Sequence, residues 1–194
     1  MKLSLVVPCY NEAESVALFQ DAVVHAFDGC GYDYEIIYVD DGSTDATLHN
    51  LKKLYAQRQC PMKIISFSRN FGKEAGLYAG MEHAGGEYIS LIDADLQQRP
   101  EIVREMVRIL DEQPKYDVVA AYQDRRSEGK ILSFFKKSFY ALINKLSNVK
   151  LQPDASDFRT FRRSVAESML KLGEYHRFSK GIFAWVGYET KFIP

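Results

Sequence analysis

Short apolar runs alternate with longer segments of helical period along the first 122 residues. The runs predict five strands, over residues 3–8, 34–43, 62–68, 87–93 and 116–122. The segments between them predict four helices, of which the first opens near Asn11 and Glu12, the second near Ser43 or Thr44, and the fourth at Pro100. This alternation is typical of βαβ units, in which helices cover both faces of a mostly parallel sheet. We therefore expect an α/β fold.

Polar and largely acidic side chains follow four of the predicted strands. Ligands of open α/β sheets bind at the carboxyl ends of the strands, so these positions predict a binding site along one edge of the sheet. The four segments are Pro8–Glu12, Asp40–Ser43, Ser68–Lys73 and Asp93–Gln97. The alternative is that βα loops are polar in any case, and that their Asp, Asn and Ser residues only cap helices.

Asp93 and Asp95 are two carboxylates one residue apart, with the amide of Gln97 close by. Hard oxygen ligands at this spacing suit a divalent cation such as Mg²⁺ or Mn²⁺ that keeps some water and accepts phosphate oxygens. Such a metal would act as a Lewis acid toward a departing diphosphate. The acid pair could instead cap the helix that follows and favour its dipole.

Asp40 and Asp41 follow the second strand. Asp41 could accept hydrogen bonds from the edge of a nucleobase, because a carboxylate is an acceptor at neutral pH. For Asp40 we favour a structural role in the turn at Gly42.

The first strand is not followed by the Gly-x-Gly-x-x-Gly turn of dinucleotide-binding proteins, which argues against that class. Gly76 and Gly80 share one face of a predicted helix, and we expect them to permit close packing there. An Asp-x-Asp phosphatase would carry its pair after the first strand, whereas this pair follows the fourth.

Composition limits the remaining classes. With 194 residues, 46% of them hydrophobic, the chain can form one domain with a sizeable core. A formal net charge of −1 gives no reason to expect a nucleic-acid partner. Three cysteines without paired spacing fit a reducing compartment. Residues 188–194 form a strand-like run that ends abruptly, so we expect the natural chain to continue beyond Pro194.

Residues 130–147 predict a basic amphipathic helix. This helix could pack on the sheet, rest on a membrane with anionic headgroups, or dock on a partner or a second copy in a homo-oligomer. Its apolar face would consist of Ile131, Phe135, Phe139, Leu142 and Leu146, with lysines elsewhere.

Six segments of the chain carry a family resemblance. They are, in order, VVPCYNEAESV, YVDDGSTDAT, SRNFGKEAG, LIDADLQQRPE, DFRTFRR and HRFSKGIFAWVGYE. In order and spacing they resemble the family 2 glycosyltransferases of the dolichyl-phosphate-mannose synthase and polyprenyl-phosphate glycosyltransferase group. The resemblance implies a single catalytic domain over residues 1–194 with a GT-A fold. Its Rossmann-like, nucleotide-sugar-binding half would end near residue 122, and an acceptor half would span residues 123–194.

The resemblance also implies a role for each matching residue. Nucleotide-sugar binding would fall to Pro8, Tyr10, Glu12, Asp41, Lys73, Asp93, Ala94, Asp95 and Gln97. Of these, Asp93, Asp95 and Gln97 would hold the Mg²⁺ or Mn²⁺ ion. The implied catalytic residues are Asp95, Asp157 and Arg159, and the implied contacts of the acceptor phosphate are Arg159, Arg177 and Lys180. Asp157 and Arg159 could instead form a structural ion pair, and Lys180 could be an ordinary exposed lysine.

The implied reaction moves a sugar, with inversion, from a nucleotide-diphosphate sugar to a polyprenyl phosphate, either undecaprenyl or dolichyl phosphate. We favour a UDP-sugar as the donor. A phosphate monoester has its second pKa at about 6, so the acceptor needs little help from a base. Two alternatives remain, namely transfer to a hydroxyl of a glycan or protein, and nucleotide-sugar binding without transfer.

Full-length bacterial members of this group usually continue into two transmembrane helices, whereas some relatives are soluble and recruit membrane subunits instead. The abrupt end at Pro194 favours the first case. We therefore expect the whole protein to be anchored at the cytoplasmic face of the cell membrane, and the residues in hand to be its soluble catalytic part.

Overall fold

The computed structural model describes residues 2–122, 155–172 and 179–194. Seven strands form one sheet in the order β3-β2-β1-β4-β6-β5-β7. All neighbouring strands are parallel except β6, which runs antiparallel to both β4 and β5. The strands are β1 (Leu3–Cys9), β2 (Tyr34–Asp40), β3 (Met62–Ser66), β4 (Tyr88–Leu91), β5 (Val118–Tyr122), β6 (Ala155–Arg162) and β7 (Thr190–Ile193). The predicted α/β fold is confirmed.

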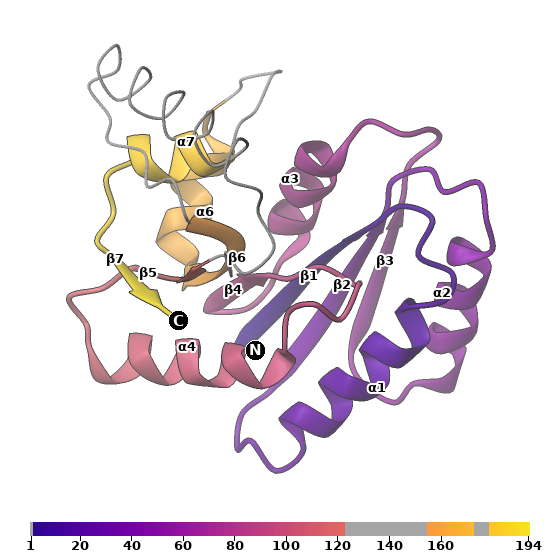
Figure 1. Ribbon diagram of the computed structural model, residues 1–194, viewed down its shortest axis with the longest axis horizontal. Coiled ribbons are helices and arrows are strands. Elements are labelled where there is room, and N and C mark those ends of the chain that lie inside the picture. The colour runs from indigo at the N-terminus through magenta and orange to yellow at the C-terminus, as the bar shows by residue number, and fades with distance from the viewer. Residues whose placement is uncertain (1, 123–154, 173–178) are drawn as a thin grey trace, which may run out of the picture.

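Helices cover both faces of this sheet (Figure 1). On one face lie α1 (Val16–Phe27), α2 (Thr47–Gln57) and α4 (Pro100–Glu112), and on the other lie α3 (Lys73–His83), α6 (Arg163–Leu170) and α7 (Ser179–Trp185). Successive strand residues point to opposite faces, so Leu5 joins the first apolar cluster and Val6 the second. Each face of the sheet therefore has its own buried core.

The five strands predicted before residue 122 are all present, but two helices begin later than predicted. The helix expected to open at Asn11 and Glu12 begins at Val16, and the one expected near Ser43 or Thr44 begins at Thr47. Asn11 has a φ of 57°, in the left-handed region, which cannot continue into a right-handed helix. The fourth helix begins at Pro100, as predicted.

Helix α3 packs closely on β1 at its two glycines. A Cβ atom added to Gly80 would lie 2.2 Å from Cγ1 of Val6, whereas one added to Gly76 would lie 3.4 Å from Cβ of Pro8. The expected close packing is confirmed and is tightest at Gly80.

Strand β6 is the main element that the hydrophobic pattern did not predict. It lies between β4 and β5, inside the sheet. The amphipathic helix predicted over residues 130–147 lies outside the described residues, and so does Arg177. In the part of the chain that the structure describes, no helix combines the length and the apolar character needed to cross a bilayer.

Candidate active site

The loops after β1 and β2 are joined by hydrogen bonds. The backbone N–H of Asn11 donates to Oγ of Ser43 over 3.0 Å, and Oδ1 of Asn11 accepts from the N–H of Thr44 over 2.9 Å. The N–H of Glu12 donates to Oγ1 of Thr47 over 2.7 Å. These side chains hold the first two strand ends of the predicted site side by side.

Asp41 is almost fully buried, with 3% of its surface exposed. Its carboxylate accepts from two consecutive backbone N–H groups, of Phe71 at 2.7 Å and of Gly72 at 2.8 Å. Asp41 therefore fixes the loop after β3 to the end of β2. A nucleobase role for Asp41 stays a prediction.

Asp40 has the structural role that was predicted for it. Its Oδ1 accepts from the N–H of Ser43 and its Oδ2 from the hydroxyl of Ser66. Gly42 adopts a φ of 65°, and a Cβ atom there would lie 2.3 Å from the backbone of Arg69, so the turn needs a glycine.

Asp93 follows β4 and is held by two side chains. Nζ of Lys73 lies 2.6 Å from Oδ1 and 2.8 Å from Oδ2 of Asp93. Gln98 donates from Nε2 to Oδ2 of Asp93 over 3.1 Å and accepts from the N–H of Asp93 over 3.0 Å. The residue that orients Asp93 is thus Gln98, which sequence reasoning passed over in favour of its neighbour Gln97.

The antiparallel direction of β6 carries its first residues to the same edge of the sheet. Arg159 of β6 pairs with Leu91, the last residue of β4. Asp157 lies two residues before Arg159, and Asp93 lies two residues after Leu91, just beyond the end of β4. Oδ2 of Asp157 lies 3.8 Å from Nζ of Lys73. The structure therefore brings together Lys73, Asp93 and Asp157, which the sequence places far apart.

Arg159 is buried, with 4% of its surface exposed. Its guanidinium carbon lies 4.1 Å from the centre of the Phe183 ring, and Nη2 donates to the carbonyl of Ser156 over 2.6 Å. Burial lowers the pKa of Arg159 to about 10, and the nearby carboxylates of Asp157 and Glu74 oppose that shift. Nε of Arg159 also donates to the backbone carbonyl of Asp157 over 3.4 Å, so the backbone of β6 holds the guanidinium group.

The residues predicted to bind a metal lie around a tight turn. Leu96 has a φ of 62°, and the N–H of Gln97 donates to Oδ1 of Asp95 over 3.1 Å. Ala94 is buried, whereas Asp95 and Gln97 are exposed.

The donor set of this turn fits a half-filled metal site. Within residues 2–122, 155–172 and 179–194, no group of three or more His, Cys, Asp or Glu side chains could enclose an ion. Asp93 and Asp95 supply hard oxygen ligands, but fewer than the six that Mg²⁺ takes, so water and a diphosphate would have to complete the shell.

The other predicted nucleotide contacts lie at the first strand end. Pro8 belongs to β1 and is half-buried, and Tyr10 is 46% exposed. The carboxylate of Glu12 accepts from the hydroxyl of Ser15, which directs it along its own loop.

Glu74 joins α3 to α7, and this contact was not predicted. Its Oε1 accepts from the N–H of Ser179 over 3.1 Å, and its Oε2 accepts from the Ser179 hydroxyl. Ser179 opens α7, in which Lys180 is the second residue. In the sequence, the only feature that points to Glu74 is its position next to Lys73, a predicted site residue.

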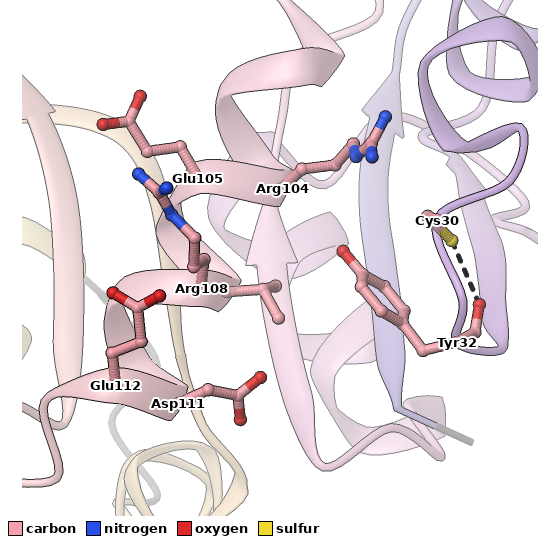
Figure 2. A pocket seen from close by; sticks show the side chains of 8 residues that line it. Cys30, Tyr32, Arg104, Glu105, Arg108, Asp111 and Glu112 are labelled. Carbon is pink, nitrogen blue, oxygen red and sulfur yellow. Dashed lines mark hydrogen bonds between the residues drawn. The ribbon is translucent and has the colours of Figure 1, made fainter.

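A separate cavity of about 570 Å³ lies between α4 and the turn that precedes β2 (Figure 2). Two of its polar side chains bind the protein: Nη1 of Arg104 donates to the carbonyl of Ala26, and Asp111 accepts from Lys2 and from the hydroxyl of Tyr88. Since the turn at Tyr32 leads into the start of β2, this cavity lies away from the carboxyl ends of the strands.

Comparison with known proteins decides the family. A family model described as Glycosyl transferase family 2 matches residues 4–170. The chain belongs to glycosyl transferase family 2. Among similar relatives of this family, CsbB of Bacillus subtilis, named a glycosyltransferase, is 40% identical over 98% of the chain. A protein of Escherichia coli K12 named prophage bactoprenol glucosyl transferase homolog is 38% identical over the whole chain. The chain spans 57% and 62% of the length of these two relatives.

Solved structures share the fold of this chain. The mannosyltransferase PcManGT of Pyrobaculum calidifontis, in complex with GDP-Man and Mn²⁺, superposes with a TM-score of 0.68 at 20% identity, covering all of this chain and 55% of that one. TarS of S. aureus, residues 1–349, gives a TM-score of 0.69 at 18% identity, covering all of this chain and 58% of that one. The predicted GT-A fold is confirmed.

Proposed function

We propose that this family 2 domain transfers a sugar, with inversion, from a nucleotide-diphosphate sugar to a polyprenyl phosphate. One observation carries the proposal: the antiparallel strand β6 places Asp157 beside Asp93, with Lys73 in contact with both. A residue expected on the acceptor side thus meets one expected on the donor side. Relatives named bactoprenol glucosyl transferase support a lipid-phosphate acceptor and favour glucose as the sugar.

The donor would lie along the carboxyl ends of β1, β2 and β4. The exposed ring of Tyr10 and the exposed Asp95 are accessible to it, and the half-filled shell at Asp93 and Asp95 suits a diphosphate-bound Mg²⁺ or Mn²⁺ ion. That ion, when bound, neutralises the charge that develops on the leaving nucleoside diphosphate. Solved neighbours hold UDP-GlcNAc in one case and GDP-Man with Mn²⁺ in another, and we favour UDP here.

The acceptor would approach from the side of β6 and α7. Its phosphate is already anionic near neutral pH, so the protein has to position it rather than deprotonate it. Arg159 stacks on Phe183 and is fixed by the carbonyl of Ser156, which makes it a rigid cation beneath the acceptor. Lys180 and Arg177 are proposed as further phosphate contacts, and Asp157 as the group that orients the acceptor.

The polyprenyl chain of the acceptor requires a membrane. We therefore propose that the whole protein works at the cytoplasmic face of the cell membrane.

Thermal unfolding of this domain with Mn²⁺ and UDP tests the donor site. Binding to the native state stabilises it by RT ln(1 + [L]/Kd), about 2.7 kcal/mol at a hundredfold excess over Kd, so the unfolding midpoint should rise by several degrees. The rise should require Mn²⁺ and UDP together and should be absent in Asp95→Ala. It should also be larger than the rise with Mn²⁺ and GDP. An unchanged midpoint under all these conditions would contradict the proposed donor.

Transfer is tested by incubating the protein with UDP-glucose, Mn²⁺ and undecaprenyl phosphate in detergent. We expect a glucosylated lipid phosphate, detected by mass spectrometry, and its loss in Asp95→Ala. Intact donor after long incubation, despite a metal-dependent thermal shift, would indicate a nucleotide-sugar binding protein instead.

A further inference from the structure

The ammonium group of Lys73 lies where the proposed donor site needs a cation. It is within 2.8 Å of both carboxylate oxygens of Asp93 and within 3.8 Å of Oδ2 of Asp157. All three side chains are partly exposed, with 43% of Lys73, 28% of Asp93 and 36% of Asp157 accessible. A solute can therefore reach the charges that Lys73 now neutralises.

Both carboxylate oxygens of Asp93 already contact Nζ of Lys73. Gln98 also occupies Oδ2 of Asp93 through its amide. A metal ion that binds Asp93 therefore meets the ammonium charge of Lys73 and competes with it for the same oxygens.

The backbone on both sides of Lys73 is held by hydrogen bonds to other elements. Gly72, with a φ of 95°, is held through its N–H by Asp41. Glu74 is held to α7 by the N–H and hydroxyl of Ser179. Only the flexible four-carbon stem of Lys73 needs to rotate for the ammonium group to leave Asp93.

We propose that Lys73 is an exchangeable cation of the donor site, which pairs with Asp93 until metal and diphosphate arrive together. The proposal rests on the proposed function. An ammonium ion and a divalent cation repel each other at one carboxylate. The Lys73–Asp93 ion pair therefore weakens the binding of the metal alone. A diphosphate gives the released ammonium group a new anionic partner. Metal and nucleotide must therefore each strengthen the binding of the other, because such coupling is reciprocal.

The test measures Mn²⁺ binding by electron paramagnetic resonance of the free ion, with and without UDP, in the wild-type protein and in Lys73→Met. Wild-type protein should bind Mn²⁺ weakly alone and more tightly with UDP. In Lys73→Met, Mn²⁺ alone should bind about three- to fivefold tighter, the range expected for loss of a competing, partly exposed ion pair. The enhancement by UDP should fall by a similar factor.

Two further variants distinguish the direct Lys73–Asp93 contact from a general effect of positive charge near the site. Lys73→Gln keeps a polar chain without the charge and should behave as Lys73→Met does. Arg69→Gln removes a cation from the same edge of the sheet, where Arg69 stacks on Phe71 instead of contacting Asp93. If Arg69→Gln tightened Mn²⁺ binding as much as Lys73→Met, a diffuse charge effect would explain the result and the role of Lys73 would be rejected.

The outcomes also distinguish this inference from the proposed function. Wild-type protein that binds Mn²⁺ and UDP, with the same coupling in Lys73→Met, would overturn the role of Lys73 and leave the donor site intact. Absence of both Mn²⁺ and UDP binding in every variant, with normal thermal unfolding, would overturn both.

Discussion

Two adjacent carboxylates, Asp40 and Asp41, show how far residue type alone determines a role. Both are buried, and both accept hydrogen bonds from loops of the candidate site. Asp40 organises its own turn, while Asp41 reaches across to the backbone of Phe71 and Gly72, directly before Lys73. Any contact between Asp41 and a nucleobase would therefore also act on the position of Lys73.

Asp41→Asn should destabilise the protein even without ligand. An amide retains one acceptor oxygen but turns an NH₂ group toward one of the two N–H groups, and hydrogen bonds to a charged acceptor contribute about 1.5–3 kcal/mol. We expect the free energy of unfolding in urea to fall by about that amount. Asp95→Asn is the control, because Asp95 is exposed and its Oδ1 acceptor is retained. Equal stability of the two variants would show that the Asp41 contacts contribute little.

Which side chains meet at the site could be predicted only in part. The family resemblance assigned Asp93 and Lys73 to the donor side and Asp157 to the acceptor side, and the structure brings the three together. The resemblance could not show that Gln98, and not Gln97, contacts Asp93. Which of the two side chains reaches Asp93 depends on the left-handed turn at Leu96. That conformation is rare for leucine, and no local pattern indicates it.

At the scale of the elements, the strands with continuous apolar runs were predictable and β6 was not. Three charged residues, Asp157, Arg159 and Arg162, interrupt its sequence, so it lacks the pattern of a buried strand. Its burial depends on distant partners: Phe183 covers Arg159, and Arg162 donates to the carbonyls of Tyr116 and Leu110. Such contacts exist only after the fold has formed.

Helix α3 provides a matched test of element packing. Gly80→Ala places a Cβ atom 2.2 Å from Cγ1 of Val6 on β1, and overpacking of this kind destabilises by about 1–3 kcal/mol. Gly76→Ala, one turn earlier on the same helix, meets ordinary contact distances and gains helix propensity of up to about 1 kcal/mol. Thermal unfolding should show a lower midpoint for Gly80→Ala and an equal or higher one for Gly76→Ala. The reverse order would mean that α3 shifts on the sheet without penalty.

At the scale of the whole molecule, the two ends of the strands carry different groups of polar side chains. The carboxyl ends of the strands carry the candidate site, whereas the other end carries a buried network around Glu35. The carboxylate of Glu35 accepts from the hydroxyl of Ser4 at 2.7 Å and the N–H of Gly85 at 2.8 Å, and it pairs with Lys63 at 2.9 Å. This network joins β1, β2, β3 and the turn before β4 without using any predicted site residue.

That network predicts a pH-dependent stability. Burial alone would raise the pKa of Glu35, but hydrogen bonds from Lys63, Ser4 and Gly85 outweigh it and hold the pKa below its ordinary value. A carboxylate with a lowered pKa in the folded state stabilises the protein above its unfolded pKa of about 4.3, and this stabilisation is lost as pH falls through the folded value.

Glu35→Gln should therefore reduce the free energy of unfolding at pH 7 by about 1–3 kcal/mol, because it removes the charge from a buried, hydrogen-bonded position. The difference from the wild-type protein should shrink below about pH 4.3, where Glu35 is protonated first in the unfolded chain and then, at lower pH, in the folded protein. Glu82→Gln, on the exposed side of α3, should stay within about 0.5 kcal/mol of the wild-type protein throughout. Urea unfolding at a series of pH values measures both variants. If the loss in the free energy of unfolding of Glu35→Gln stayed constant down to pH 3, the charge of Glu35 would not be its cause. The shape of the side chain would then stabilise this end of the sheet.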